Sequence, residues 1–146
     1  MIEIIPMGQS HIDKICEIEK VCFKIPWSKD SFKKELNENP LAYYIVAISG
    51  TDIVGYAGMW IIIDEGHITN IAVHPNYWNR GIGTNLIDNI ITEAEKRDLI
   101  GLTLEVRQSN IKAQKLYTKV GFTPEGVRKG YYRDTGEDGV IMWKNL

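Results

Sequence analysis

The chain has 146 residues, of which 44% are hydrophobic, and a formal net charge of −2 at pH 7. This is enough for one domain with its own core, expected over residues 1–146, and the charge argues against a general nucleic-acid-binding surface. The longest uncharged apolar run, residues 53–63, is far shorter than the roughly 18 residues that a membrane span needs.

The N-terminal segment "IEIIP" reads as a short strand, and it lacks the basic start of a secretory signal, so a cytoplasmic protein is expected. Ser10 is predicted to cap a first helix. The residues of that helix that recur at helical spacing are Ile12, Ile15, Cys16, Ile18 and Cys22. Six positions apart, the two cysteines point in different directions, so two reduced thiols are expected.

A second helix is predicted to begin in "PWSKDSF". Ser28 is the expected cap, and Trp27 and Phe32 have the spacing of a hydrophobic staple. Because Pro40 disfavours the helical conformation at Asn39, the helix is expected to end there.

Three strands are predicted next. "LAYYIVAIS" and "IVGYAGMWIII" flank Gly50-Thr51-Asp52, which is typical of a hairpin. A turn over residues 64–66 then leads into a strand from about His67 to Val73.

The stretch "RGIGT", residues 80–84, stands between that strand and a helical pattern. Amides in the first turn of a helix have no intrahelical partner, and Gly81 and Gly83 place no Cβ in front of them. With Arg80 beside them, these residues favour a phosphate or pyrophosphate ligand. No lysine follows, as in a P-loop, and Leu86 replaces the third glycine of a dinucleotide fingerprint. In isolation, a tight turn without a ligand is an equally good interpretation.

"LTLEV" is predicted to be a buried strand, and residues 110–120 a helix that ends at Gly121. Two more strands are expected near residues 122–126 and 140–143. Strands and helices alternate only in the second half of the chain. The fold class is therefore α/β with a mixed sheet.

Two segments, "NIAVHPNYWNRGIGTNLI" and "LEVRQSNIKAQKLYTKVGF", resemble the GNAT acyltransferases, which bind acetyl-CoA. Within that superfamily, "PWS", "NIAV" and "YY…GEDGVIM" are similar to the branch of ribosomal-protein-alanine N-acetyltransferases (RimI-like). The resemblance implies the GNAT fold, a mostly antiparallel sheet of about seven strands with about four helices.

The resemblance also implies a cofactor site. The amides around Ile82, Gly83 and Thr84 would hold the CoA pyrophosphate next to Arg80 and Gly81, and the strand at Ile71, Ala72 and Val73 would pair with the pantetheine arm. Asn110, a helix cap by its position, would also contact the CoA arm. The family usually has Gln or Arg where this chain has Trp78, so a side-chain contact is expected to be missing.

Two residues are candidate proton carriers. Glu105 interrupts an apolar strand and could simply face solvent, but its match to "LEVR.SN" favours a general base. Tyr117 shares a helical face with Ala113, Leu116 and Val120 and could be an ordinary core aromatic; the resemblance makes it the general acid for the CoA thiolate. Both are expected beside the thioester.

The resemblance places Trp27, Tyr131 and Tyr132 in the walls of the acceptor groove. It implies transfer of an acetyl group to the N-terminal α-amine of a protein, an alanine of a small-subunit ribosomal protein being the family's expected target. Acetylation of a small-molecule amine or of lysine, and a non-catalytic CoA-binding module, remain alternatives. No metal site is predicted, because His11, His67 and His74 are scattered and no Cys-x-x-Cys occurs. Arg107 and Arg128 are assigned no role.

Overall fold

The computed structural model describes all 146 residues, and its seven strands form one sheet in the order β1-β2-β3-β4-β5-β7-β6. The strands are β1 (Ile2–Pro6), β2 (Ala42–Ser49), β3 (Asp52–Ile62), β4 (Glu65–Val73), β5 (Gly101–Arg107), β6 (Thr123–Tyr132) and β7 (Glu137–Asn145). All neighbouring pairs are antiparallel except β4 and β5. The predicted mixed, mostly antiparallel sheet is confirmed.

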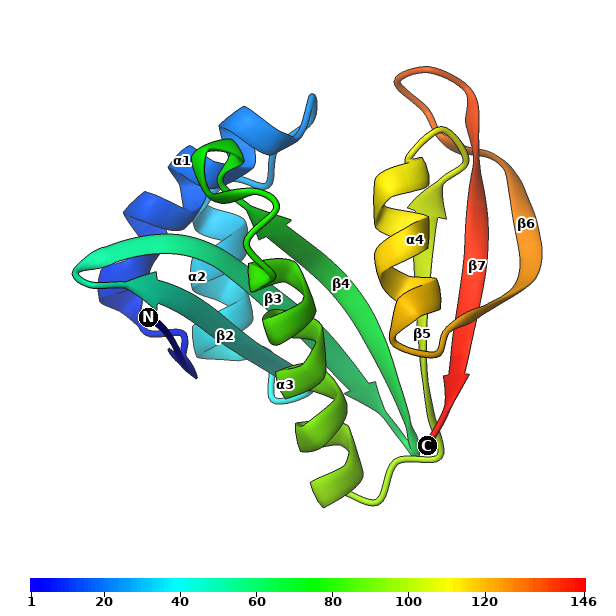
Figure 1. Ribbon diagram of the computed structural model, residues 1–146, viewed down its shortest axis with the longest axis horizontal. Coiled ribbons are helices and arrows are strands. Elements are labelled where there is room, and N and C mark those ends of the chain that lie inside the picture. Colours follow the sequence, from blue (N-terminus) through cyan, green and yellow to red (C-terminus); the bar gives the residue numbers. More distant parts are fainter.

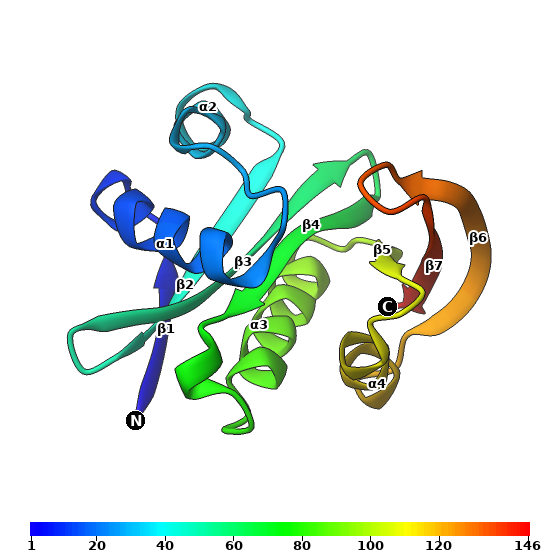
Figure 2. The same cartoon turned by 90° about the horizontal axis from the view of Figure 1, so that it is seen from above.

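Four helices cover the sheet, α1 and α2 on one face and α3 and α4 on the other (Figures 1 and 2). They are α1 (Ile12–Cys22), α2 (Lys29–Glu38), α3 (Ile82–Lys96) and α4 (Ile111–Lys119). Each face of the sheet has its own buried cluster, the larger one lying beneath α3 and α4. None of the helices is both long enough and apolar enough to cross a membrane.

The start of α2 agrees with the sequence prediction. The Ser28 hydroxyl accepts a hydrogen bond from the Ser31 amide at 3.1 Å, and the rings of Trp27 and Phe32 lie 5.4 Å apart. Phe32 is fully buried against the edges of Tyr44 and Tyr56. The staple therefore fixes the segment before α2 to the core beneath the helix.

The predicted cap at Ser10 is wrong. Ser10 lies inside a 3₁₀ turn, Gln9–His11, and α1 begins after it at Ile12 with no side-chain cap. The imidazole Nδ1 of His11 instead accepts a hydrogen bond from the Gly8 amide at 2.9 Å, which satisfies a donor just before the turn.

Several strands are longer than predicted, among them β7, which was expected near residues 140–143 and spans Glu137–Asn145. β4 begins at Glu65, because residues 65 and 66 already pair with β3. β6 continues to Tyr132, where it pairs with Glu137 of β7, although its residues are mostly exposed. An edge strand can be held by backbone hydrogen bonds to its neighbour without alternating apolar side chains. The sequence pattern therefore predicted a strand that is too short.

The parallel strands β4 and β5 pair only over Glu65–His67 and Gly101–Thr103. Just beyond this pairing the register of β3 and β4 shifts, so that Gly58 faces Asn70 and Met59 faces Ile68, with Thr69 as the extra residue. A bulge of this kind bends its strand. Past it, β4 and β5 diverge toward one end of the molecule (Figure 1).

Candidate active site

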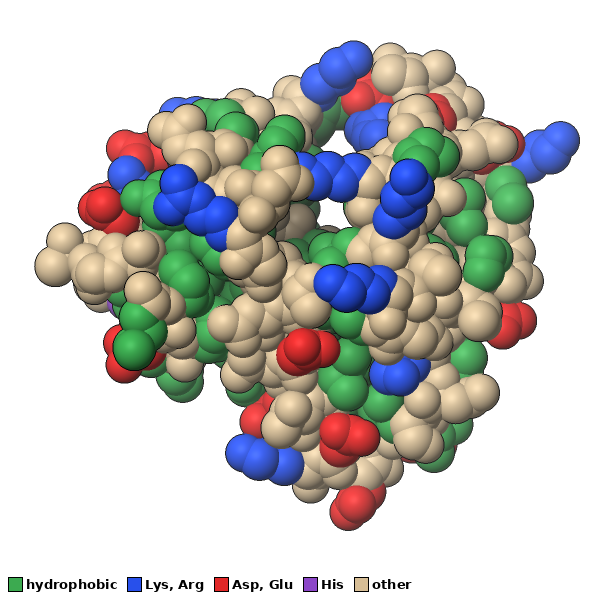
Figure 3. Space-filling view, viewed as in Figure 1, with side chains coloured by type: hydrophobic (Ala, Val, Ile, Leu, Met, Phe, Trp, Pro, Cys, Tyr) green, Lys and Arg blue, Asp and Glu red, His purple; other side chains and the backbone are tan.

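The divergence of β4 and β5 leaves an opening that continues through the molecule. Figure 3 shows this opening with Lys and Arg side chains gathered around its rim. It is bounded by β4 and the start of α3 on one side and by β5 and α4 on the other (Figure 1). An elongated ligand could therefore reach both faces of the sheet.

The start of α3 lies at this opening and has unpaired donors. Gly81, the N-cap, adopts a left-handed conformation with φ of 77°, and no side chain caps the helix. The first backbone bond runs from the Asn85 amide to the Gly81 carbonyl, which leaves the amides of Ile82, Gly83 and Thr84 outside the helical ladder. No side chain caps this cradle of amides with a hydrogen bond, and its chemistry fits a diphosphate.

Gly83 also has a packing role. A Cβ built on it would lie 3.3 Å from Leu116 Cδ2 of α4, which is tighter than an ordinary contact. Glycine therefore allows α3 and α4 to approach each other at the cradle, in addition to keeping the amides accessible.

The edge of β4 that faces the opening carries free backbone groups. The amide of His74 bonds to Val54 of β3, so residues 72 and 74 are directed toward β3, whereas Ile71 and Val73 are directed away from it. The side chain of Ala72, by contrast, is buried in the cluster beneath α1. The predicted pantetheine partners, Ile71 and Val73, are thus the residues with outward-facing backbone.

One of these free backbone groups, the Val73 carbonyl, is already bonded to Trp78. Its indole N–H donates to the Val73 carbonyl at 2.6 Å, and the Cys22 thiol approaches the same oxygen at 3.4 Å. Cys16 and Cys22 are both free, and burial is the main cause that raises the pKa of each thiol. Two unbridged thiols were predicted, and this is confirmed.

Glu105 lies on β5 with its side chain about one quarter exposed. Its Oε1 accepts a hydrogen bond from Nε of Arg128 on β6 at 3.0 Å. This partner could not be predicted from the sequence, because the pairing of β6 with β7 brings it from 23 residues away. The ion pair orients the carboxylate at the surface of β5.

Tyr117 is buried on α4, with its ring 5.8 Å from that of Phe122. Burial, first, and then the nearby Tyr132 raise the pKa of its phenol well above the ordinary value. The hydroxyl therefore retains its proton at neutral pH.

Glu105 and Tyr117 lie on different faces of β5. Leu104 and Val106 share the buried cluster of Tyr117, and Glu105, between them, points the other way. Tyr132 lies close to both: burial and then Tyr131 raise the pKa of Tyr132 to about 12, and the charge of Glu105 contributes. The carboxylate and the phenol are thus separated by β5 rather than side by side.

The turn between β6 and β7 is held by Arg107. Its guanidinium forms two hydrogen bonds to Asp134, at 3.0 and 2.9 Å, and lies 4.2 Å from the ring centroid of Tyr132. The rings of Tyr131 and Tyr132 meet edge to face at 5.0 Å. Lys24, between α1 and α2, is near enough to help lower the pKa of Asp134, so the two loops face each other across the opening.

Arg107→Met is expected to lower the melting temperature by a few degrees at pH 7. Hydrogen bonding to Arg107 is the main cause that lowers the pKa of Asp134. Because the pKa of Asp134 is lower in the folded than in the unfolded chain, the ion pair stabilises the fold at any pH above the unfolded-state pKa, near 3.9. This stabilisation is lost as the pH falls through the folded-state pKa. Melting curves at pH 7 and at about pH 3 test this. Arg133→Met, in the same turn, is the control, and an undiminished difference at the lower pH would contradict the assignment.

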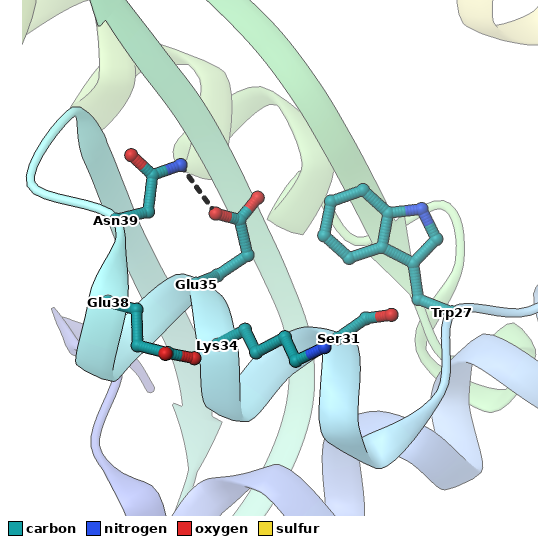
Figure 4. A pocket seen from close by; sticks show the side chains of 6 residues that line it. All are labelled: Trp27, Ser31, Lys34, Glu35, Glu38 and Asn39. Carbon is teal, nitrogen blue, oxygen red and sulfur yellow. Dashed lines mark hydrogen bonds between the residues drawn. The ribbon is translucent and has the colours of Figure 1, made fainter.

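Trp27 lies at the end of a polar groove of about 590 Å³ that runs along α2 (Figure 4). The other residues that line the groove are Ser31, Lys34, Glu35, Glu38 and Asn39. The carboxylate of Glu35 is satisfied there by Asn39, Tyr44 and Trp60. Among the predicted site residues only Trp27 lines this groove, so it is distinct from the cradle at α3.

The backbone amide of Trp27 is fixed by a second buried carboxylate. Glu19 accepts this bond at 2.9 Å and is also bonded by the Tyr56 hydroxyl and by Asn70, whose amide oxygen has no partner. Neither Glu19 nor Glu35 was singled out from the sequence. A signal existed, since each lies three or four positions after a buried apolar residue, Ile15 or Phe32, on the inward face of its helix.

Asn110 caps α4 as predicted, its side chain accepting the Ala113 amide at 3.1 Å. The described structure brings together no set of three His, Cys, Asp or Glu side chains that could ligate a metal ion.

Comparison with known proteins gives a consistent result. The model of the acetyltransferase (GNAT) family matches residues 12–122. A candidate ribosomal protein bS18-alanine N-acetyltransferase of Bacillus subtilis (strain 168) is 47% identical over 140 residues, which cover 96% of this chain and 93% of that protein.

Solved structures show the same fold. The crystal structure of the ribosomal-protein-S18-alanine N-acetyltransferase from Escherichia coli matches with a TM-score of 0.91 and 31% identity, covering 100% of this chain and 94% of that one. The PaiA N-acetyltransferase from Thermoplasma acidophilum, in complex with coenzyme A, matches with a TM-score of 0.86 and 19% identity, covering 100% and 99%.

Proposed function

Because the chain belongs to the acetyltransferase (GNAT) family, and is therefore an acetyl-CoA-dependent enzyme, we propose that it acetylates the N-terminal α-amine of a protein. The proposed acceptor is the N-terminal alanine of ribosomal protein bS18. The 47% identity to the B. subtilis protein of that name supports this acceptor, and the similarity extends over nearly the whole of both chains. We assign the activity to residues 1–146 as one domain, and to the cytoplasm, where free thiols such as Cys16 and Cys22 are typical.

The chemistry favours an α-amine as the acceptor. The attacking nitrogen must be neutral, and the reference pKa is near 8 for an α-amine and near 10.4 for lysine. At pH 7 neutralisation costs about 1.4 kcal/mol for the α-amine and about 4.6 kcal/mol for lysine. A single carboxylate such as Glu105 is a sufficient base for the first task.

The residues around the opening can be given roles in direct transfer. The bound cofactor supplies the acetyl group as a thioester. The amides of Ile82, Gly83 and Thr84 hold its diphosphate, and the backbone of Ile71 and Val73 orients its pantetheine arm. Glu105 accepts a proton from the acceptor amine, directly or through water, and the Tyr117 hydroxyl donates a proton to the departing sulfur.

The observation that carries this proposal is the position of Glu105. Its carboxylate lies on the face of β5 opposite the buried cluster that contains Tyr117, is partly exposed, and is near Tyr132. A protein N-terminus entering between the loops would meet the carboxylate first and the thioester behind it.

Mass analysis of the products tests the acceptor. The protein is incubated with acetyl-CoA and either a peptide that begins with alanine or an α-blocked copy that carries lysine. A gain of one acetyl group on the free alanine peptide alone is expected. Transfer to the lysine of the blocked copy would favour side-chain acetylation, and transfer to neither peptide would exclude this class of acceptor.

A further inference from the structure

Two cations beside the α3 cradle have no carboxylate partner. The ion pairs of the protein engage other basic side chains, namely Lys14, Lys29, His67, Arg97, Arg107 and Arg128. Arg80 and Lys112 instead lie over aromatic rings, 5.1 Å from the centroid of Tyr77 and 4.1 Å from that of Trp78. Both charges therefore remain available to an anion.

The Trp78–Lys112 contact joins the segment before α3 to the start of α4. Trp78 precedes α3, whereas Lys112 is in the first turn of α4. The indole is fixed by the hydrogen bond from its N–H to the Val73 carbonyl, and about half of Trp78 is exposed. The ring therefore holds the ammonium group between the starts of two helices, where the amides of residues 82–84 also lie.

We propose that Lys112 is a phosphate-binding residue of the cofactor site and that Trp78 is the support that holds it there. A cation over an exposed ring is bound less strongly than a cation that donates hydrogen bonds to a phosphate. The ammonium can therefore exchange the ring for a phosphate oxygen when the ligand arrives. This gives Trp78 a function at the position where the family pattern has Gln or Arg.

The ligand is a phosphate group of CoA, which carries a diphosphate and a 3′-phosphate on its ribose. The unpaired amides of residues 82–84 at the start of α3 would bind the diphosphate, and Lys112, in the first turn of α4, would supply a second donor. The ammonium group of a lysine is a compact charge on a flexible side chain, so it can bind either the diphosphate or the 3′-phosphate.

Calorimetric titration without any acceptor tests the inference, so the outcome is independent of which amine is acetylated. The ligands are CoA and 3′-dephospho-CoA, and the variants are Lys112→Gln and, as a matched control, Lys115→Gln. Lys115 is exposed in the next turn of the same helix, so the control removes the same charge. Lys112→Gln is expected to weaken CoA binding about tenfold, and Lys115→Gln much less.

The two ligands distinguish the phosphates. Equal losses for both ligands assign Lys112 to the diphosphate, and a loss confined to CoA assigns it to the 3′-phosphate. CoA affinity in Lys112→Gln equal to that in Lys115→Gln would overturn the proposal.

Trp78→Ala tests the support. If the ring acts by holding Lys112, the double variant with Lys112→Gln is expected to bind CoA no more weakly than Lys112→Gln alone. Losses that simply add would overturn the role of Trp78.

Discussion

Tyr117→Phe is expected to lower kcat by roughly 100-fold or more, with little change in the affinity for acetyl-CoA. The substitution removes one hydroxyl and keeps the ring, which packs against Phe122 in the core. Burial holds the pKa of this phenol high, so the group is a protonated donor throughout the working pH range. Without it, the departing thiolate must take its proton from water.

Steady-state kinetics combined with equilibrium binding of acetyl-CoA measures both effects. Tyr43→Phe is a suitable control, because Tyr43 is a partly buried tyrosine on β2 whose ring contacts Arg97 rather than the opening. Unchanged turnover in Tyr117→Phe would remove this residue from the mechanism. A loss of binding together with turnover would give it a structural role.

Glu105→Gln is expected to lower kcat/KM by roughly 100-fold at pH 7, and by more at lower pH. The α-amine has a reference pKa near 8, so a growing share of it is protonated as the pH falls, and a base is then indispensable. Above that pKa most of the amine is already neutral, and the variant is expected to approach the parent enzyme. The pH profile of kcat/KM is therefore the decisive measurement.

Arg128→Gln is the matched control for this experiment. Both substitutions break the same ion pair, but only Glu105→Gln removes the carboxylate. If the carboxylate is the base, the steep loss at low pH is confined to Glu105→Gln. A pH-independent loss in Glu105→Gln, or the same profile in both variants, would show that the ion pair matters for structure and that Glu105 is not the base.

Most secondary-structure elements could be located from local sequence signals. Ser28 caps α2, Trp27 and Phe32 form the staple, and Asn110 caps α4, because each of these interactions joins residues at most five positions apart. The prediction failed at Ser10, where a 3₁₀ turn and a His11 side chain replaced the expected cap. It also shortened β6, whose exposed side chains give no periodic pattern.

The partners within the candidate site could not be predicted in this way. Arg107 and Arg128 were assigned nothing, yet one fixes the turn beside Tyr132 and the other pairs with Glu105. Their hydrogen-bond partners lie 23 and 27 residues away in sequence, and only the order β5-β7-β6 brings them together. At Trp78 the sequence predicted the loss of a side-chain contact to the cofactor. In the structure its indole bonds to the Val73 carbonyl and contacts the Lys112 ammonium group.

Local sequence patterns were enough to predict which chemical groups are available: glycines at the start of a helix, a carboxylate in an apolar strand and a phenol on an amphipathic helix. Each of these features depends on residue type and on short spacings along the chain, and both can be read from the sequence. The separation of β4 and β5 after three pairs, and the location of Glu105 and Tyr117 on different faces of β5, depend on the fold as a whole. The reason is that a bulge at Thr69 and the pairing of distant strands are set by the packing of the whole sheet, and no short segment specifies them.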